Sequence, residues 1–113
     1  MDKKKITRDG KPPITFTGEL LAEADNKDHN STRWTTITIY RTKGGKFVAK
    51  IERCTQWQGE SDSTTAEVCE DFGEVIAWLT DEDGDLRPVS QEAVEAAIKV
   101  DPSLAKFWTQ EVD

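Results

Sequence analysis

The sequence predicts an α+β fold in which an antiparallel four-stranded sheet is built around a central hairpin, residues 33–57. Two observations predict this class. Runs rich in β-branched and aromatic residues fill the first 70 positions, whereas apolar residues at helical spacing follow them. Strands that precede helices in the chain are typical of α+β domains, in which helices cover one face of the sheet.

The central hairpin turns at Lys43-Gly44-Gly45, between two strand-like runs. A three-residue loop pairs odd positions with odd positions, because side chains alternate between the two faces of a strand. Only this pairing places the apolar residues of both strands on the same face. We therefore expect a three-residue loop, with a glycine in the left-handed conformation. The first face then carries Ile37, Ile39, Phe47, Ala49 and Ile51. The second face carries Trp34, Thr36, Thr38, Tyr40, Val48, Lys50 and Glu52.

The segments that flank the hairpin differ in character. Residues 1–13 hold five basic and two acidic side chains, a net charge of +3, and predict a flexible basic arm. Residues 14–113 then form a single α+β domain. From Ile14 onward, apolar positions alternate as in a half-buried strand, with Leu21 as the exception. Residues 64–70 complete the predicted sheet as its fourth strand.

The helices follow the strands. Asp71 and Glu74 have the spacing of a capping box and predict a helix over residues 71–80 that covers the sheet. The apolar stripe of this helix consists of Phe72, Val75, Ile76 and Leu79. Two further short C-terminal helices are expected, one capped by Ser90 and one with Pro102 at its first position.

The composition restricts the class of protein. A chain of 113 residues, 35% apolar and 33% charged, supports one core built from few residues. No run approaches the roughly 18 apolar residues of a membrane span, and residues 1–5 lack the apolar segment of a signal peptide. We therefore expect a cytoplasmic protein without a membrane partner, in which Cys54 and Cys69 are free thiols.

Catalytic and metal-binding patterns are missing from the sequence. His29 is the single histidine and stands in a polar loop, so no nucleophile–base pair is recognisable. We expect no enzymatic activity, no catalytic residues, no metal ligands and no cofactor.

The acidic loop at residues 81–92 offers a calcium-binding interpretation. It places carboxylates at positions one, three, five and twelve of a calcium-loop template: Asp81, Asp83, Asp85 and Glu92. Leu86, however, stands where the template requires glycine for its sharp turn. An acidic linker between two helices is therefore the preferred interpretation, and calcium binding is an alternative.

The candidate binding residues lie on the hairpin and at its ends: Trp34, Tyr40, Arg41, Lys43, Lys46 and Trp57. Tryptophan, tyrosine and arginine are enriched at protein interfaces. The leading interpretation is a small, acidic, non-enzymatic binding protein that acts through protein–protein interaction. Immunity, antidefence and nucleic-acid-mimicking proteins share this physical profile. The net charge of −7 suits a basic partner.

Three other outcomes stay open at this stage. The face that carries Trp34 and Tyr40, together with the basic arm, could stack single-stranded nucleic acid, although a net charge of −7 opposes this. The same aromatic surface and an exposed strand edge could form a homodimer. Alternatively, the C-terminal helices fold back and bury the second face of the hairpin.

Overall fold

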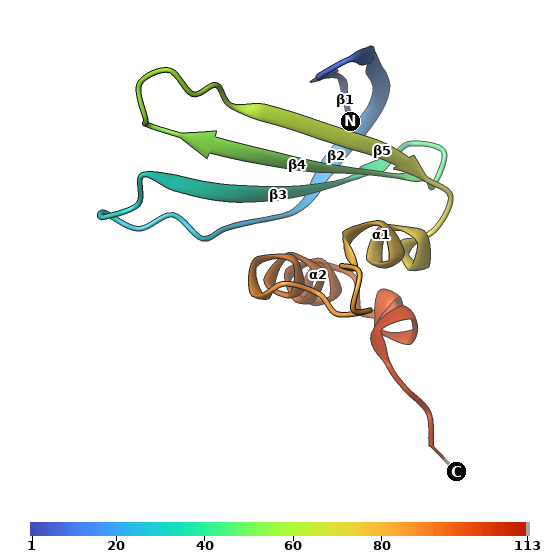
Figure 1. Cartoon of the computed structure of the whole chain (residues 1–113). Coiled ribbons are helices and arrows are strands. Elements are labelled where there is room, and N and C mark those ends of the chain that lie inside the picture. The colour runs from blue at the N-terminus through green and yellow to red at the C-terminus, as the bar shows by residue number, and fades with distance from the viewer. Residues whose placement is uncertain (113) are drawn as a thin grey trace.

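A computed structural model describes residues 1–112 as a curled five-stranded antiparallel sheet with three helices on one side of it (Figure 1). The strands pair in chain order: β1 (Asp2–Arg8), β2 (Lys11–Asp25), β3 (Arg33–Thr42), β4 (Phe47–Thr55) and β5 (Ser63–Cys69). The helices are α1 (Phe72–Leu79), α2 (Pro88–Val100) and the 3₁₀ helix η1 (Pro102–Trp108). The α+β class is confirmed, but the sheet has five strands instead of the four expected.

The central hairpin has the predicted register. Ile37 lies opposite Ile51 and Ile39 opposite Ala49. The Thr42 N–H donates to the Lys46 carbonyl over 2.8 Å, which leaves a three-residue loop between them. Gly45 takes the left-handed conformation in this loop, with φ 87°. The two hairpin faces are therefore the predicted ones.

The first face and the helices enclose the larger core. α2 packs on β2 and β3, while α1 packs on β4 and β5, so α1 shares with α2 the covering role that was predicted for it alone. Asp71 caps α1 by accepting the Glu74 N–H over 2.9 Å, and the Glu74 carboxylate reaches back to the Glu70 N–H. The largest fully buried residues of this core are Phe72, Ile37, Ile39, Val75 and Val94.

The second face is covered by the N-terminal hairpin. Residues 1–13, predicted to be a flexible basic arm, form β1 and the start of β2 instead. Ile6 pairs with Ile14, and both side chains are buried against the sheet. Lysines conceal this strand in the sequence, but exposed lysines are common on edge strands because they block further pairing. The second core contains Ile6, Ile14, Val48 and Ala66, with Phe16 and Tyr40 packed against it.

A bend in β2 brings the N-terminal hairpin over the second face. At Gly18 the backbone of β2 lies so close to β3 that a Cβ atom would be only 2.3 Å from the Arg41 carbonyl oxygen. Three residues later, the register shifts between Leu20 and Ala22, which marks Leu21 as a β-bulge. The bulge explains why Leu21 breaks the sequence alternation. It turns the second half of β2 toward the helices.

The turn of the N-terminal hairpin is tied to β5 across the curled sheet. The Asp9 N–H donates to the Thr64 carbonyl over 3.1 Å, and the Asp9 carboxylate accepts the Thr64 N–H over 2.8 Å. Arg8 donates to the Ala66 carbonyl. Because the C-terminal helices lie on the opposite face, the expectation that they might bury the second face is wrong (Figure 1).

Ile39→Ala should lower the free energy of unfolding by about 2–5 kcal/mol, because Ile39 is 0% exposed and its truncation leaves a cavity. Denaturant melts measure this loss. Val68→Ala is the control, since Val68 is 42% exposed and should cost less than about 1 kcal/mol. Equal losses in the two variants would contradict the assignment of the faces.

Removal of residues 1–10 should lower the free energy of unfolding by at least the roughly 2–5 kcal/mol of one lost core aliphatic residue. The deletion removes buried Ile6 and uncovers the second core. Chemical denaturation of the truncated and full chains measures the difference. Lys5→Gln serves as the control, because exposed Lys5 should change stability by only about 0.5 kcal/mol or less. An unchanged denaturation midpoint after truncation would instead support the prediction that residues 1–13 are a flexible arm.

Candidate binding surface at the free end of the sheet

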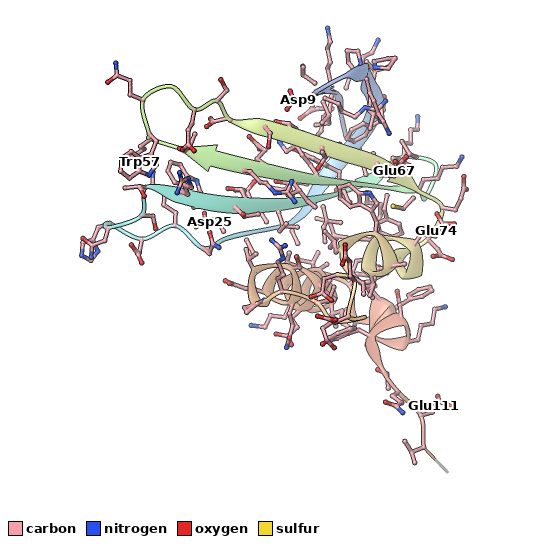
Figure 2. The ribbon with its side chains drawn as sticks, in the orientation of Figure 1. Asp9, Asp25, Trp57, Glu67, Glu74 and Glu111 are labelled. Atoms are coloured by element: carbon pink, nitrogen blue, oxygen red, sulfur yellow. The ribbon has the colours of Figure 1, made fainter. Side chains whose placement is uncertain are left out.

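The six candidate binding residues do not form one surface. Trp34 and Trp57 lie at the sheet end formed by residues 26–35 and 53–62, which we call the free end. This end is remote from α1, as the positions of Trp57 and Glu74 in Figure 2 show. The β3–β4 turn holds Lys43 and Lys46 at the other end. Tyr40 and Arg41 lie between the two ends, on opposite faces of β3.

An ion pair and a tryptophan organise one side of the free end. The Arg33 guanidinium donates to both carboxylate oxygens of Glu60, over 3.1 and 2.8 Å. The Thr55 hydroxyl also donates to Glu60, over 2.6 Å. The Arg33 guanidinium lies 5.7 Å from the centre of the Trp57 ring, within the range of a cation–π contact. These contacts position the Trp57 ring, which is still 53% exposed.

The pKa values of the pair follow from these hydrogen bonds. The hydrogen bond from Arg33 lowers the pKa of Glu60, and the one from Thr55 adds to it. The hydrogen bond to Glu60 in turn raises the pKa of Arg33. Both groups are therefore charged across the physiological pH range.

The second tryptophan of the free end, Trp34, also makes a cation–π contact. The Lys27 ammonium lies 4.2 Å from the centre of the Trp34 ring. Cys54 lies opposite Trp34 in the adjacent strand. Burial raises the pKa of the Cys54 thiol, and the nearby Asp62 raises it further. The thiol is therefore protonated at neutral pH and is a poor nucleophile.

A cavity of about 380 Å³ opens at the free end. Its charged lining consists of three arginines and one glutamate: Arg33, Arg53, Arg87 and Glu60. Glu60 neutralises Arg33, whereas Arg53 and Arg87 make no ion pair within residues 1–112. A chain with a net charge of −7 thus has a locally basic site. The sequence prediction missed these arginines, although Arg87 directly precedes Pro88, the first residue of a helix.

Tyr40 does not lie on the expected aromatic binding surface. Its ring stacks edge-on against Phe16, with ring centres 5.5 Å apart, and the ammonium groups of Lys4 and Lys50 flank it. Burial lowers the pKa of Lys50, but its hydrogen bond with Glu52 and its proximity to Tyr40 outweigh this and raise the pKa overall. Tyr40 therefore belongs to the second core and not to the free end.

Arg41 joins the sheet to the C-terminal helices. Its guanidinium donates to the Asp101 carboxylate over 2.5 Å. Asp101 separates α2 from η1, and its carboxylate also accepts from the Ser103 hydroxyl. The hydrogen bond from Ser103 lowers the pKa of Asp101, and Arg41 lowers it further. Arg41 thus stabilises the fold.

The acidic loop is organised by its own backbone. The Asp81 carboxylate accepts the N–H groups of Asp83 and Asp85, each over 3.0 Å, and Gly84 adopts φ 84°. Glu92 lies in α2, outside the loop. Within residues 1–112, no group of three acidic, histidine or cysteine side chains has a geometry that could hold a metal ion.

The described residues also contain no helix that is long and apolar enough to cross a membrane. No known family matches this chain, and neither does any curated protein or solved structure. The free end is therefore interpreted from its own geometry.

The ion pair of Arg33 and Glu60 should persist down to pH 4.5, the ordinary pKa of a glutamate, because the pKa of Glu60 is lowered. A carboxyl group whose pKa is lowered by folding stabilises the folded state at every pH above its ordinary pKa. This stabilisation is lost as the pH falls through the pKa of the folded state. The NMR resonance of the Trp57 indole N–H, assigned by its loss in Trp57→Phe, should shift with a midpoint below pH 4.5. Glu60→Gln should abolish the shift. A midpoint at or above pH 4.5 would contradict the ion pair.

Proposed function

We propose that this protein is a small non-enzymatic binding protein that engages a protein partner through the free end of the sheet. The observation that carries the proposal is Trp57, a 53% exposed ring held beside Arg33 at an end that the helices do not cover. Solvent contact with a large aromatic ring costs free energy, which a partner recovers by covering it. Trp and Arg are also the residues most often dominant in protein interfaces.

The charge of the free end, and not the net charge of the chain, indicates the charge expected of the partner segment. The sequence alone suggests a basic partner because the chain carries −7 overall. At the free end, however, Arg53 and Arg87 have no carboxylate partner in the described part of the chain. Complementary potentials steer association, so the segment that contacts this end is acidic.

The non-enzymatic part of the proposal rests on the reactive side chains. Burial raises the pKa of Cys69 to about 11 and also raises that of Cys54, so neither thiol is activated as a nucleophile. Within residues 1–112, the one hydrogen bond of the His29 ring is with the neighbouring Asn30 amide, in an exposed loop. Neither type of side chain has the neighbours that nucleophilic catalysis uses.

Single-stranded nucleic acid is the second candidate ligand. Two tryptophan rings beside arginines can stack bases and contact phosphates. The sequence-based hypothesis of nucleic-acid binding relied on a flexible basic arm and on Tyr40. The structure supports neither role, because the arm is part of the sheet and Tyr40 packs against Phe16. Only Trp34 and Trp57 then offer stacking surfaces at the free end.

Trp57→Ala should reduce partner capture about 30-fold, the effect of losing roughly 2 kcal/mol at a dominant interface residue. Immobilised protein is incubated with lysate of its native host, and captured proteins are quantified by mass spectrometry. Trp108→Ala is the matched control, because Trp108 is 39% exposed and lies in η1, away from the free end.

The proposal predicts a set of proteins retained by the wild type and by Trp108→Ala but lost with Trp57→Ala. Equal losses in both variants, or no loss in either, would contradict it. Sedimentation of the purified protein identifies a second copy of the chain as the partner if Trp57→Ala dissociates a dimer. Capture that disappears after nuclease treatment favours the nucleic-acid candidate.

A further inference from the structure

A second cavity, of about 150 Å³, adjoins the free end beneath α2. It shares Thr35, Arg53 and Arg87 with the larger cavity, so the two cavities are neighbours. The sheet forms one wall, and the first residues of α2, including Val89 and Ser90, form another. One water molecule needs only about 15 Å³ on this measure, so the cavity has room for a larger ligand.

The beginning of α2 presents unsatisfied donors to this cavity. Arg87 occupies the N-cap position, where its side chain caps nothing, and the first turn contains no acidic residue. The N–H groups of Val89 and Ser90 therefore find no side-chain acceptor among residues 1–112. Unsatisfied N–H groups and the helix dipole together favour an anion at such a position.

Ser90 provides a second, independent indication of a ligand. The residue is only 4% exposed, and its hydroxyl makes no hydrogen bond within the described residues. No side-chain oxygen or nitrogen is both unpartnered and sealed from solvent, so this hydroxyl retains solvent contact. Ser90 lines the cavity, so the cavity can supply this solvent contact. A hydroxyl that has no protein partner can donate a hydrogen bond to a ligand bound there.

Arg53 of β4 and Arg87 also line the cavity, beside apolar residues of the sheet and the helices. The two arginines of β3, Arg33 and Arg41, each pair with a carboxylate, whereas Arg53 and Arg87 do not pair within the described chain. The carboxylate that shares the cavity is that of Asp81, which accepts two backbone N–H groups of its own loop. The donors of the cavity therefore exceed its acceptors, and its charge is positive.

We propose that this cavity binds the phosphate group of a phosphomonoester. Arg53 and Arg87 would pair with the phosphate oxygens, while the Ser90 hydroxyl and the N–H groups at the start of α2 would donate to them. This inference goes beyond the proposed interface and stands without it, because it rests on the cavity and not on Trp57.

A monoester fits these donors better than the alternative anions. It carries nearly two negative charges at neutral pH and offers three strong acceptor oxygens, which can occupy two guanidinium groups and a helix terminus together. A carboxylate has only two oxygens and one charge. A nucleic-acid backbone would bring further phosphates toward a surface with net charge −7, which repels them.

The test is a titration of the full chain with inorganic phosphate, followed by backbone amide NMR at constant ionic strength. The amide resonances of Val89 and Ser90 should shift in a saturable manner. Arg53→Gln and Arg87→Gln should each weaken binding about tenfold or more, and Ser90→Ala about threefold, as expected for charged and neutral hydrogen bonds respectively. Lys99→Gln is the matched control, because it removes the same charge from the exposed far end of α2 and should bind phosphate like the wild type.

Four further ligands define the chemistry of the site. Phosphoserine should shift the same resonances, whereas serine should not, and acetate should bind at least tenfold more weakly than phosphate. The absence of saturable shifts, or equal losses in Lys99→Gln and Arg87→Gln, would overturn the proposal. Acetate binding as tight as phosphate binding would overturn the assignment to phosphate. Tighter binding of a short single-stranded oligonucleotide at these resonances would overturn the assignment to a monoester.

Discussion

The close approach of β2 to β3 at Gly18 is the constraint on which the rest of the structure depends. The backbone of β2 approaches the Arg41 carbonyl so closely that a Cβ atom at position 18 would lie 2.3 Å from its oxygen. This approach lets one strand of 15 residues serve two cores. Its first half places Ile14 and Phe16 on the second face, and its second half, after the bulge at Leu21, directs Ala22 and Ala24 toward the helices. Glycine permits this close approach because it has no side chain to clash.

Coverage of both faces explains where a binding surface can lie. The helices cover the first face and the N-terminal hairpin covers the second, so the aromatic residues between them serve packing, as Tyr40 does against Phe16. The free end projects from these layers, as the position of Trp57 shows (Figure 2). It combines exposed aromatic surface with two arginines that make no ion pair in the part of the chain that the structure describes, and both proposals therefore concern this end of the molecule. Residues 70–113 hold twelve acidic and three basic side chains. This acidic character does not extend to the free end, because Arg87, which directly precedes α2, lines both cavities.

Local patterns predicted much of the fold, whereas contacts between distant segments escaped prediction. The hairpin register followed from the period of the strands and from Lys43-Gly44-Gly45, and α1 followed from Asp71 and Glu74. β1 was missed because only Ile6 marks it as buried, and its partner surface on β4 and β5 is far away in sequence. The free end was predicted only through Trp34 and Trp57. Arg53 and Arg87 are 34 positions apart in the sequence, so only the fold brings them to one cavity.

We infer that the N-terminal hairpin is an integral layer of the structure and that binding is therefore confined to the free end. Native-state hydrogen exchange tests this inference most directly. We expect the ladder amides of β1 and β2 around Ile6 and Ile14 to exchange with nearly the same free energy of opening as those of Ile39 and Val48. We also expect fast exchange in residues 26–32 and 56–62. Fast exchange throughout β1, with slow exchange in β3 and β4, would contradict the claim and leave the second face open to a partner.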